Sequence, residues 1–133
     1  MQLEKQVTSL KISKKLKELG VKQESLFWWA NNPKTDGKGN FFDNWEIVAP
    51  YLSTEGYYGA LDYSAFTVAE LGEMLPDNGK LQLSVWKYKG WEYSYLKNRS
   101  GQGDDETLVI ADERNEANAR AKMLIYLIDN KLI

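Results

Sequence analysis

Neither cysteine nor histidine occurs among the 133 residues. Without cysteine the chain has no disulfide, no thiolate metal site and no thiol nucleophile. Without histidine it lacks the side chain that titrates near neutral pH, which is also the commonest metal ligand. The acidic run Asp104, Asp105 and Glu106 lacks the spacing of a calcium loop, so we expect it to be solvated. We therefore expect no enzyme activity, no bound metal and no cofactor.

A large net charge and a long apolar run are also lacking. The formal net charge is −2, which gives no bulk attraction to nucleic acid or to an anionic membrane. No stretch approaches the length that spans a bilayer, and the first residues contain no apolar signal core. The expectation is a cytoplasmic protein without a membrane segment. A protein partner fits this charge better than nucleic acid does, and the oligomeric state stays open.

The composition that is present is that of a folded domain. Hydrophobic residues make up 43% and charged residues 27% of the chain, which is ordinary for a globular protein. The length suits one domain with one core, so residues 1–133 are expected to form a single domain. Five tryptophans and eight tyrosines are a surplus, and they require either a core or a binding surface to hold them.

Three amphipathic helices are expected from the capping signals and the apolar spacing. Ser9 can cap a helix over residues 9–19, and Gly20 can end it. Residues 67–70 have the sequence of a capping box, and they begin a short helix that Pro76 ends. Asn115 can cap a final helix whose apolar stripe must pack on the rest of the molecule.

The remaining segments indicate antiparallel strands. Residues 25–30 and 44–49 are expected to form a hairpin across an exposed loop at 31–40. Residues 50–66 show no clean period and are expected to form a long loop or an irregular strand. A second hairpin at 81–97 turns at Lys89-Gly90, and a last strand covers 106–110. The element order α-β-β-α-β-β-β-α predicts an α+β fold. Its antiparallel sheet would have about five strands packed by three helices, and cover on both faces would make an α/β/α sandwich.

The second hairpin is rich in aromatic residues. If Tyr88 pairs with Trp91, one face of the hairpin carries Trp86, Tyr88, Trp91, Tyr93 and Tyr95. This face would either be covered by a helix or form a stacking platform for bases, sugars or a peptide. A domain of this size needs large side chains in its core, which favours cover by a helix.

Three segments carry a resemblance to a protein group. They are the stretch at 5–23, the stretch Ala-Phe-Thr-Val-Ala-Glu-Leu-Gly-Glu-Met-Leu-Pro at 65–76 and the stretch Ala-Arg-Ala-Lys-Met-Leu-Ile-Tyr-Leu-Ile-Asp-Asn-Lys-Leu-Ile at 119–133. Together they resemble small uncharacterised proteins encoded by bacteriophages, prophages and gut bacteria. The resemblance implies a shared fold, because its residues are the expected helix caps and apolar stripes. It implies no activity, cofactor or catalytic residue.

These observations favour a small non-catalytic phage or mobile-element protein. We expect it to bind a macromolecular partner through the loops 31–40 and 50–64, the second of which contains Tyr57 and Tyr58. One alternative is a single-stranded nucleic-acid binder that uses the aromatic hairpin at 81–97. Another is a small-molecule or carbohydrate binding module that uses the loop tyrosines.

Overall fold

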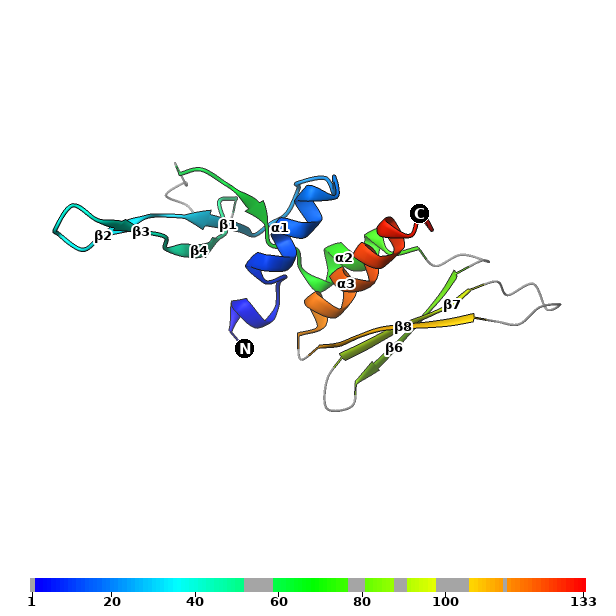
Figure 1. Ribbon diagram of the computed structural model, residues 1–133. Coiled ribbons are helices and arrows are strands. Elements are labelled where there is room, and N and C mark those ends of the chain that lie inside the picture. Colours follow the sequence, from blue (N-terminus) through cyan, green and yellow to red (C-terminus); the bar gives the residue numbers. More distant parts are fainter. Residues whose placement is uncertain (1, 52–58, 77–80, 88–90, 98–105, 114) are drawn as a thin grey trace.

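The computed structural model describes residues 2–51, 59–76, 81–87, 91–97, 106–113 and 115–133. A short 3-10 helix, η1 (Leu3–Lys5), precedes the helix α1 (Leu10–Glu18). Two further helices are α2 (Val68–Met74) and α3 (Glu116–Asp129). Figure 1 shows these helices between a narrow β-hairpin on one side and a sheet on the other. Since the strands pair antiparallel, the predicted α+β class is confirmed.

The three helices begin at the capping residues that the sequence predicts. The Ser9 hydroxyl accepts a hydrogen bond from the amide of Ile12. Thr67 and Glu70 form a complete capping box, in which each side chain accepts from the backbone amide of the other. The Asn115 side chain caps α3. These contacts satisfy amide donors that have no partner inside the helix, so they fix where each helix starts.

The main hydrophobic core lies where α1, α2 and α3 meet. Phe66 stands at its centre with no exposed surface, just before α2. Fully buried alanines at 117, 119 and 121 let the first turns of α3 approach the other elements closely. The prediction that the last helix packs into the core is confirmed, because its apolar side chains at 123, 124 and 127 are buried in this cluster.

The N-terminal strands form two small sheets beside α1. In the first, β1 (Trp28–Asn31) lies between β4 (Trp45–Val48) and β5 (Tyr63–Ser64). In the second, β2 (Lys34–Thr35) pairs with β3 (Phe41–Phe42). The predicted hairpin between the first two strand regions is confirmed by the β1–β4 pairing. Within residues 50–66, where a long loop or an irregular strand is expected, β5 is a strand of two residues that pair with Trp28 and Trp29.

The C-terminal strands form a sheet of their own. Its order is β6 (Leu81–Lys87), β7 (Trp91–Lys97) and β8 (Glu106–Glu113), and α3 contacts β7 and β8. Among the described residues the strands therefore divide into three sheets instead of one sheet of about five strands. Each strand pairs with partners on its own side of α2 in the sequence, which separates the C-terminal sheet from the two N-terminal ones. Cover of one sheet on both faces, as in an α/β/α sandwich, stays a prediction.

The β6–β7 hairpin has a register one residue away from the predicted one. Lys87 pairs with Trp91, so three residues (88–90) connect the strands where the sequence suggested the two-residue turn Lys89-Gly90. Successive residues of a strand belong to opposite faces of the sheet. A register shift of one residue therefore places on opposite faces two residues of neighbouring strands that were expected on the same face.

This shift divides the predicted aromatic face. Trp86 pairs with Glu92, whereas Tyr93 pairs with Val85. Directly paired residues share a face, so Trp86 occupies the opposite face from the positions of Trp91, Tyr93 and Tyr95. The expectation that Trp86 shares one face with these three residues is wrong. Tyr88 lies outside the described residues.

The segment before α1 is tied into the interior through Thr8, which has no exposed surface. Its backbone amide donates to the carbonyl of Phe66 at 2.9 Å, and its hydroxyl accepts from the amide of Phe66 at 3.0 Å. The same hydroxyl lies 2.7 Å from that of Ser13, and the indole of Trp29 donates to the Thr8 carbonyl. Buried polar groups are costly without partners, and this network supplies them.

The start of α3 holds the same N-terminal segment from the other side. The amide group of Asn115 donates to the carbonyl of Val7 at 3.0 Å. The side-chain oxygen of Asn118 accepts from the amide of Ser9 at 2.9 Å. Residues more than a hundred positions apart are thereby joined by side-chain hydrogen bonds.

Candidate functional site

The predicted binding residues fall in different parts of the molecule. Tyr57, Tyr58 and Tyr88 lie outside the described residues. Trp86 lies on β6, and the aromatic residues at 91, 93 and 95 lie on β7, with the register given above. A stacking role for these residues stays a prediction. Of the two predicted binding loops, 31–40 is described throughout.

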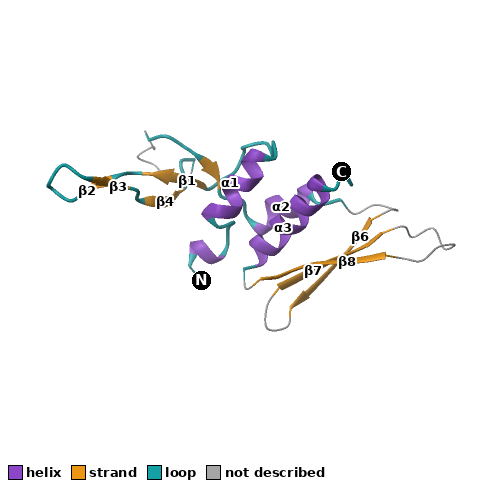
Figure 2. Cartoon of the chain, viewed as in Figure 1, coloured by secondary structure: helices purple, strands orange, loops and turns teal. Residues whose placement is uncertain are grey.

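This loop is the centre of a hairpin arm, here defined as residues 32–43. The arm is formed by β2 and β3 and extends away from the helices (Figure 2). Every residue in it is exposed. At its β3 strand, Phe41 is 76% exposed and Phe42 is 53% exposed. Two phenyl rings left in water add little to folding, whereas burial of each would contribute about 1.5–3 kcal/mol.

The exposure of both rings has a simple geometric cause. Adjacent residues on a strand face opposite sides, so one surface cannot cover both Phe41 and Phe42. The β2–β3 ribbon has two strands, and among the described residues it makes no extensive contact with a helix. The sequence contained this signal, because two neighbouring phenylalanines directly follow a run of turn-forming residues. The prediction of loop 31–40 did not use it.

The tip of the arm is ordered by one carboxylate. Asp36 accepts hydrogen bonds from the amide of Lys38 and from the side chain of Asn40 at 2.9 Å. Gly37 and Gly39 both have positive φ, as this tight turn requires. The Asn40 side chain, followed by the Lys38 amide, lowers the pKa of Asp36 below its ordinary value. The loop therefore has a defined shape, although it is exposed.

The base of the arm is held by a ladder of polar side chains. Asn31 donates to Asp43 at 3.0 Å and accepts from the amide of Asn44 at 2.9 Å. Asn32 and Asn44 both donate to the carboxylate of Glu46, at 3.1 and 2.9 Å. The side chains of Asn44 and Asn32 lower the pKa of Glu46. These contacts fix the direction in which the arm leaves the first sheet.

A cluster of lysines and aromatic rings lies between α1 and the first sheet. The ammonium of Lys14 is 5.1 Å from the ring centre of Trp45 and 5.7 Å from that of Tyr63. Lys17 lies 5.1 Å from the Tyr63 ring and donates to the carbonyl of Asp62. Cation–π contacts of this length contribute about 0.5–1 kcal/mol at exposed sites. They attach α1 to β4 and β5.

A buried serine and a carboxylate also lie close together. The hydroxyl of Ser25 is 2.9 Å from Oε1 of Glu70 and 3.1 Å from the carbonyl of Ala65. The same Glu70 oxygen accepts from the amide of Thr67. A carboxylate used in this way holds the start of α2 against the segment before β1. We interpret the pair as a structural link.

The described part of the chain contains neither a cluster of metal ligands nor a membrane-spanning helix. Within those residues no group of three or more histidine, cysteine, aspartate or glutamate side chains gathers in a way that could hold a metal ion. Asp104 and Asp105 of the acidic run lie outside that part, and Glu106 begins β8. No described helix is both long enough and apolar enough to cross a membrane.

Comparisons of the chain with protein-family models, with curated proteins and with solved structures found no match. The geometry of the surface is therefore what points to a function. On that basis the hairpin arm is the candidate site, since its exposed rings and ordered tip have no evident role in the fold.

Proposed function

We propose that the protein is a non-catalytic binding protein of a phage or mobile element that holds a macromolecular partner through its hairpin arm. The exposure of Phe41 and Phe42 carries this proposal. Aromatic side chains are enriched among the residues that dominate binding energy at protein interfaces. The resemblance to small phage proteins supports the biological setting, and the position of loop 31–40 in the arm supports its use in binding.

The shape of the arm favours a protein partner with a cleft. A narrow ribbon can enter a cleft and bury both faces, which is the geometry that covers two phenyl rings on opposite sides. The hydrogen bonds of Asp36 and Asn31 order the arm before binding. Ordering in advance reduces the entropy lost on association. The predicted second loop, 50–64, remains a second contact in this proposal, and its residues 52–58 lie outside the described ones.

Photo-crosslinking tests this proposal. A photoreactive benzoylphenylalanine replaces Phe41, the protein is irradiated in bacterial lysate, and the captured partner is identified by mass spectrometry. The purified partner is then titrated against the wild type and against the double variant Phe41→Ala/Phe42→Ala. Loss of two aromatic anchors should weaken binding by about tenfold or more.

Leu26→Ala is the matched control, because Leu26 is 49% exposed and lies outside the arm. It should bind the partner with wild-type affinity. Both proteins should melt at the wild-type temperature, since the three side chains are exposed. Equal affinity of the double variant and the wild type would exclude the arm as the binding site.

A further inference from the structure

A second surface, independent of the arm, lies between α1 and α3. It is a groove of about 520 Å³ whose apolar part is contributed by Leu10, Ile12 and Ile125. Ile12 is nearly buried, whereas Leu10 and Ile125 are half-buried. The volume falls within the usual range of ligand pockets, about 300–1,000 Å³.

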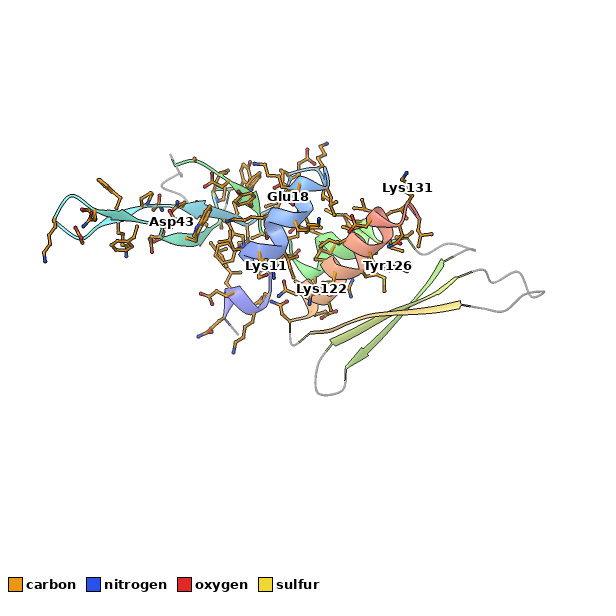
Figure 3. The ribbon with its side chains drawn as sticks, in the orientation of Figure 1. Lys11, Glu18, Asp43, Lys122, Tyr126 and Lys131 are labelled. Carbon is orange, nitrogen blue, oxygen red and sulfur yellow. The ribbon has the colours of Figure 1, made fainter. Side chains whose placement is uncertain are left out.

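Lysines dominate the charge around this groove. Among the described residues that line it, four are lysines and one is a glutamate, Glu18. The whole chain has a net charge of −2, so this basic surface is local. Lys14 is directed to the rings of Trp45 and Tyr63. Lys11 and Lys15 are exposed, and Figure 3 shows Lys11 on α1 and Lys122 on the neighbouring stretch of α3.

The placement of these lysines is unfavourable for α1 itself. Lys11 lies in the first turn of the helix, where the helix dipole favours negative charge, and that turn has no acidic residue. Lys11 and Lys15 are four residues apart, and like charges at this spacing destabilise a helix. The fold alone gives no reason for this arrangement. An anionic ligand beside the helix would reverse both effects.

We propose that this groove binds an acidic amphipathic helix of a partner protein. The aliphatic side chains of such a helix would cover Leu10, Ile12 and Ile125, and its carboxylates would lie beside Lys11, Lys15 and Lys122. Helices that place an apolar face in a groove between two helices are a common recognition mode. Charge complementarity around the groove then selects the acidic partner and its orientation.

Other anionic ligands fit the groove less well. A single-stranded nucleic acid gains affinity by stacking its bases on aromatic rings, and no described residue lining the groove is aromatic. The acyl chain of a fatty acid would lie along an open surface groove with one side in water. An amphipathic helix presents its polar side to the solvent there and its apolar side to the protein.

Fluorescence polarisation with a synthetic probe tests the proposal. The probe is a labelled 14-residue peptide of leucine and glutamate, with the leucines at the spacing i, i+3, i+4, i+7. We expect saturable binding that weakens as salt is added. A peptide of the same composition with its leucines scrambled should bind much more weakly, as should a peptide with lysine in place of glutamate.

Two matched triple variants locate the site. Lys11→Gln/Lys15→Gln/Lys122→Gln should weaken binding of the probe by about tenfold, because it removes three positive charges that face the carboxylates of the probe. Lys5→Gln/Lys22→Gln/Lys131→Gln removes the same charge from exposed lysines outside both the groove and the arm, and this variant should bind as the wild type does. Thermal melting checks that both variants fold.

Several results would overturn the proposal. They are no binding of the probe, equal binding of the scrambled peptide, or equal weakening by the two triple variants. Displacement of the bound probe by dodecanoate or by oligothymidylate at lower concentration than by unlabelled peptide would assign the groove to a lipid or to nucleic acid instead.

Discussion

Around Phe66, side chains of three helices are removed from water, whereas around Phe41 and Phe42 two phenyl rings remain exposed. The helical core is held mainly by apolar burial, with a few buried hydrogen bonds that satisfy polar groups. The hairpin arm buries almost nothing and is ordered by asparagine and aspartate side chains. The difference shows that one chain can obtain stability from one region and present an ordered surface with another.

The largest expected effect is on stability, which should depend on the helical core and not on the hairpin arm. Deletion of residues 122–133 removes Met123, Leu124 and Leu127, all of which are buried. Truncating a buried residue of this type to alanine costs about 2–5 kcal/mol, and small proteins have a total stability of about 5–15 kcal/mol. The truncated protein should show no cooperative transition when thermal unfolding is followed by circular dichroism.

Phe41→Ser/Phe42→Ser is the control for that deletion. It should change the free energy of unfolding by no more than about 0.5 kcal/mol per residue, since both rings are exposed. A truncated form that melts as sharply as the wild type, or an arm variant that unfolds, would remove the distinction between the regions.

Thr8→Val sharpens the comparison inside the core. The substitution keeps the side-chain volume and leaves the amide of Phe66 without its acceptor, while the hydroxyl of Ser13 keeps only the Thr8 carbonyl. A buried group without its hydrogen bond costs about 1–3 kcal/mol. Urea denaturation should show this loss, and a double-mutant cycle with Ser13→Ala should show coupling. Additive effects would contradict the shared network.

Thr67→Ala probes a smaller contribution at the edge of the core. It removes the acceptor for the amide of Glu70 and should lower the free energy of unfolding by about 1 kcal/mol. Thr67→Ser retains the hydroxyl and should restore most of this stability in the same denaturation experiment. If serine and alanine behave alike, the capping box does not determine the stability of α2.

The smallest effect concerns the arm and its response to acid. The pKa of Asp36 is lowered in the folded protein, chiefly by the side chain of Asn40. The contribution of Asp36 to order is therefore complete above its ordinary pKa and is lost as the pH falls through the lowered value. The amide resonances of Lys38 and Asn40 should shift in that range in an NMR titration. Asp36→Asn should abolish the shift without changing the core resonances.

Helix ends, which depend on neighbouring residues, were predicted better than strand pairings, which depend on residues far apart in the sequence. The sequence correctly predicted the helix caps at Ser9, at Asn115 and in the capping box at 67–70, because a cap depends on residues within one helical turn. The β6–β7 register was wrong by one residue, since a glycine near a turn does not distinguish a two-residue from a three-residue connection. The β5 pairing with β1 was missed because its signal lies in residues distant along the chain.

The candidate site was predicted only in outline. The run of turn formers at 31–40 indicated an exposed loop, and the loop is exposed. The ladder at its base could not be predicted, because Asn32 and Glu46 meet only after β1 and β4 pair. The groove between α1 and α3 was missed for the same reason, as it requires Lys11 and Lys122 to lie on neighbouring helices.

The link between Ser9 and Asn118 has a consequence for synthesis in the cell. Residues 109 positions apart must meet to join the start of α1 to α3, and α1 emerges from the ribosome long before α3 is made. The first helix therefore leaves the exit tunnel without the partner that completes its packing. Contacts of such long sequence separation slow folding and leave apolar surface open to chaperones during translation.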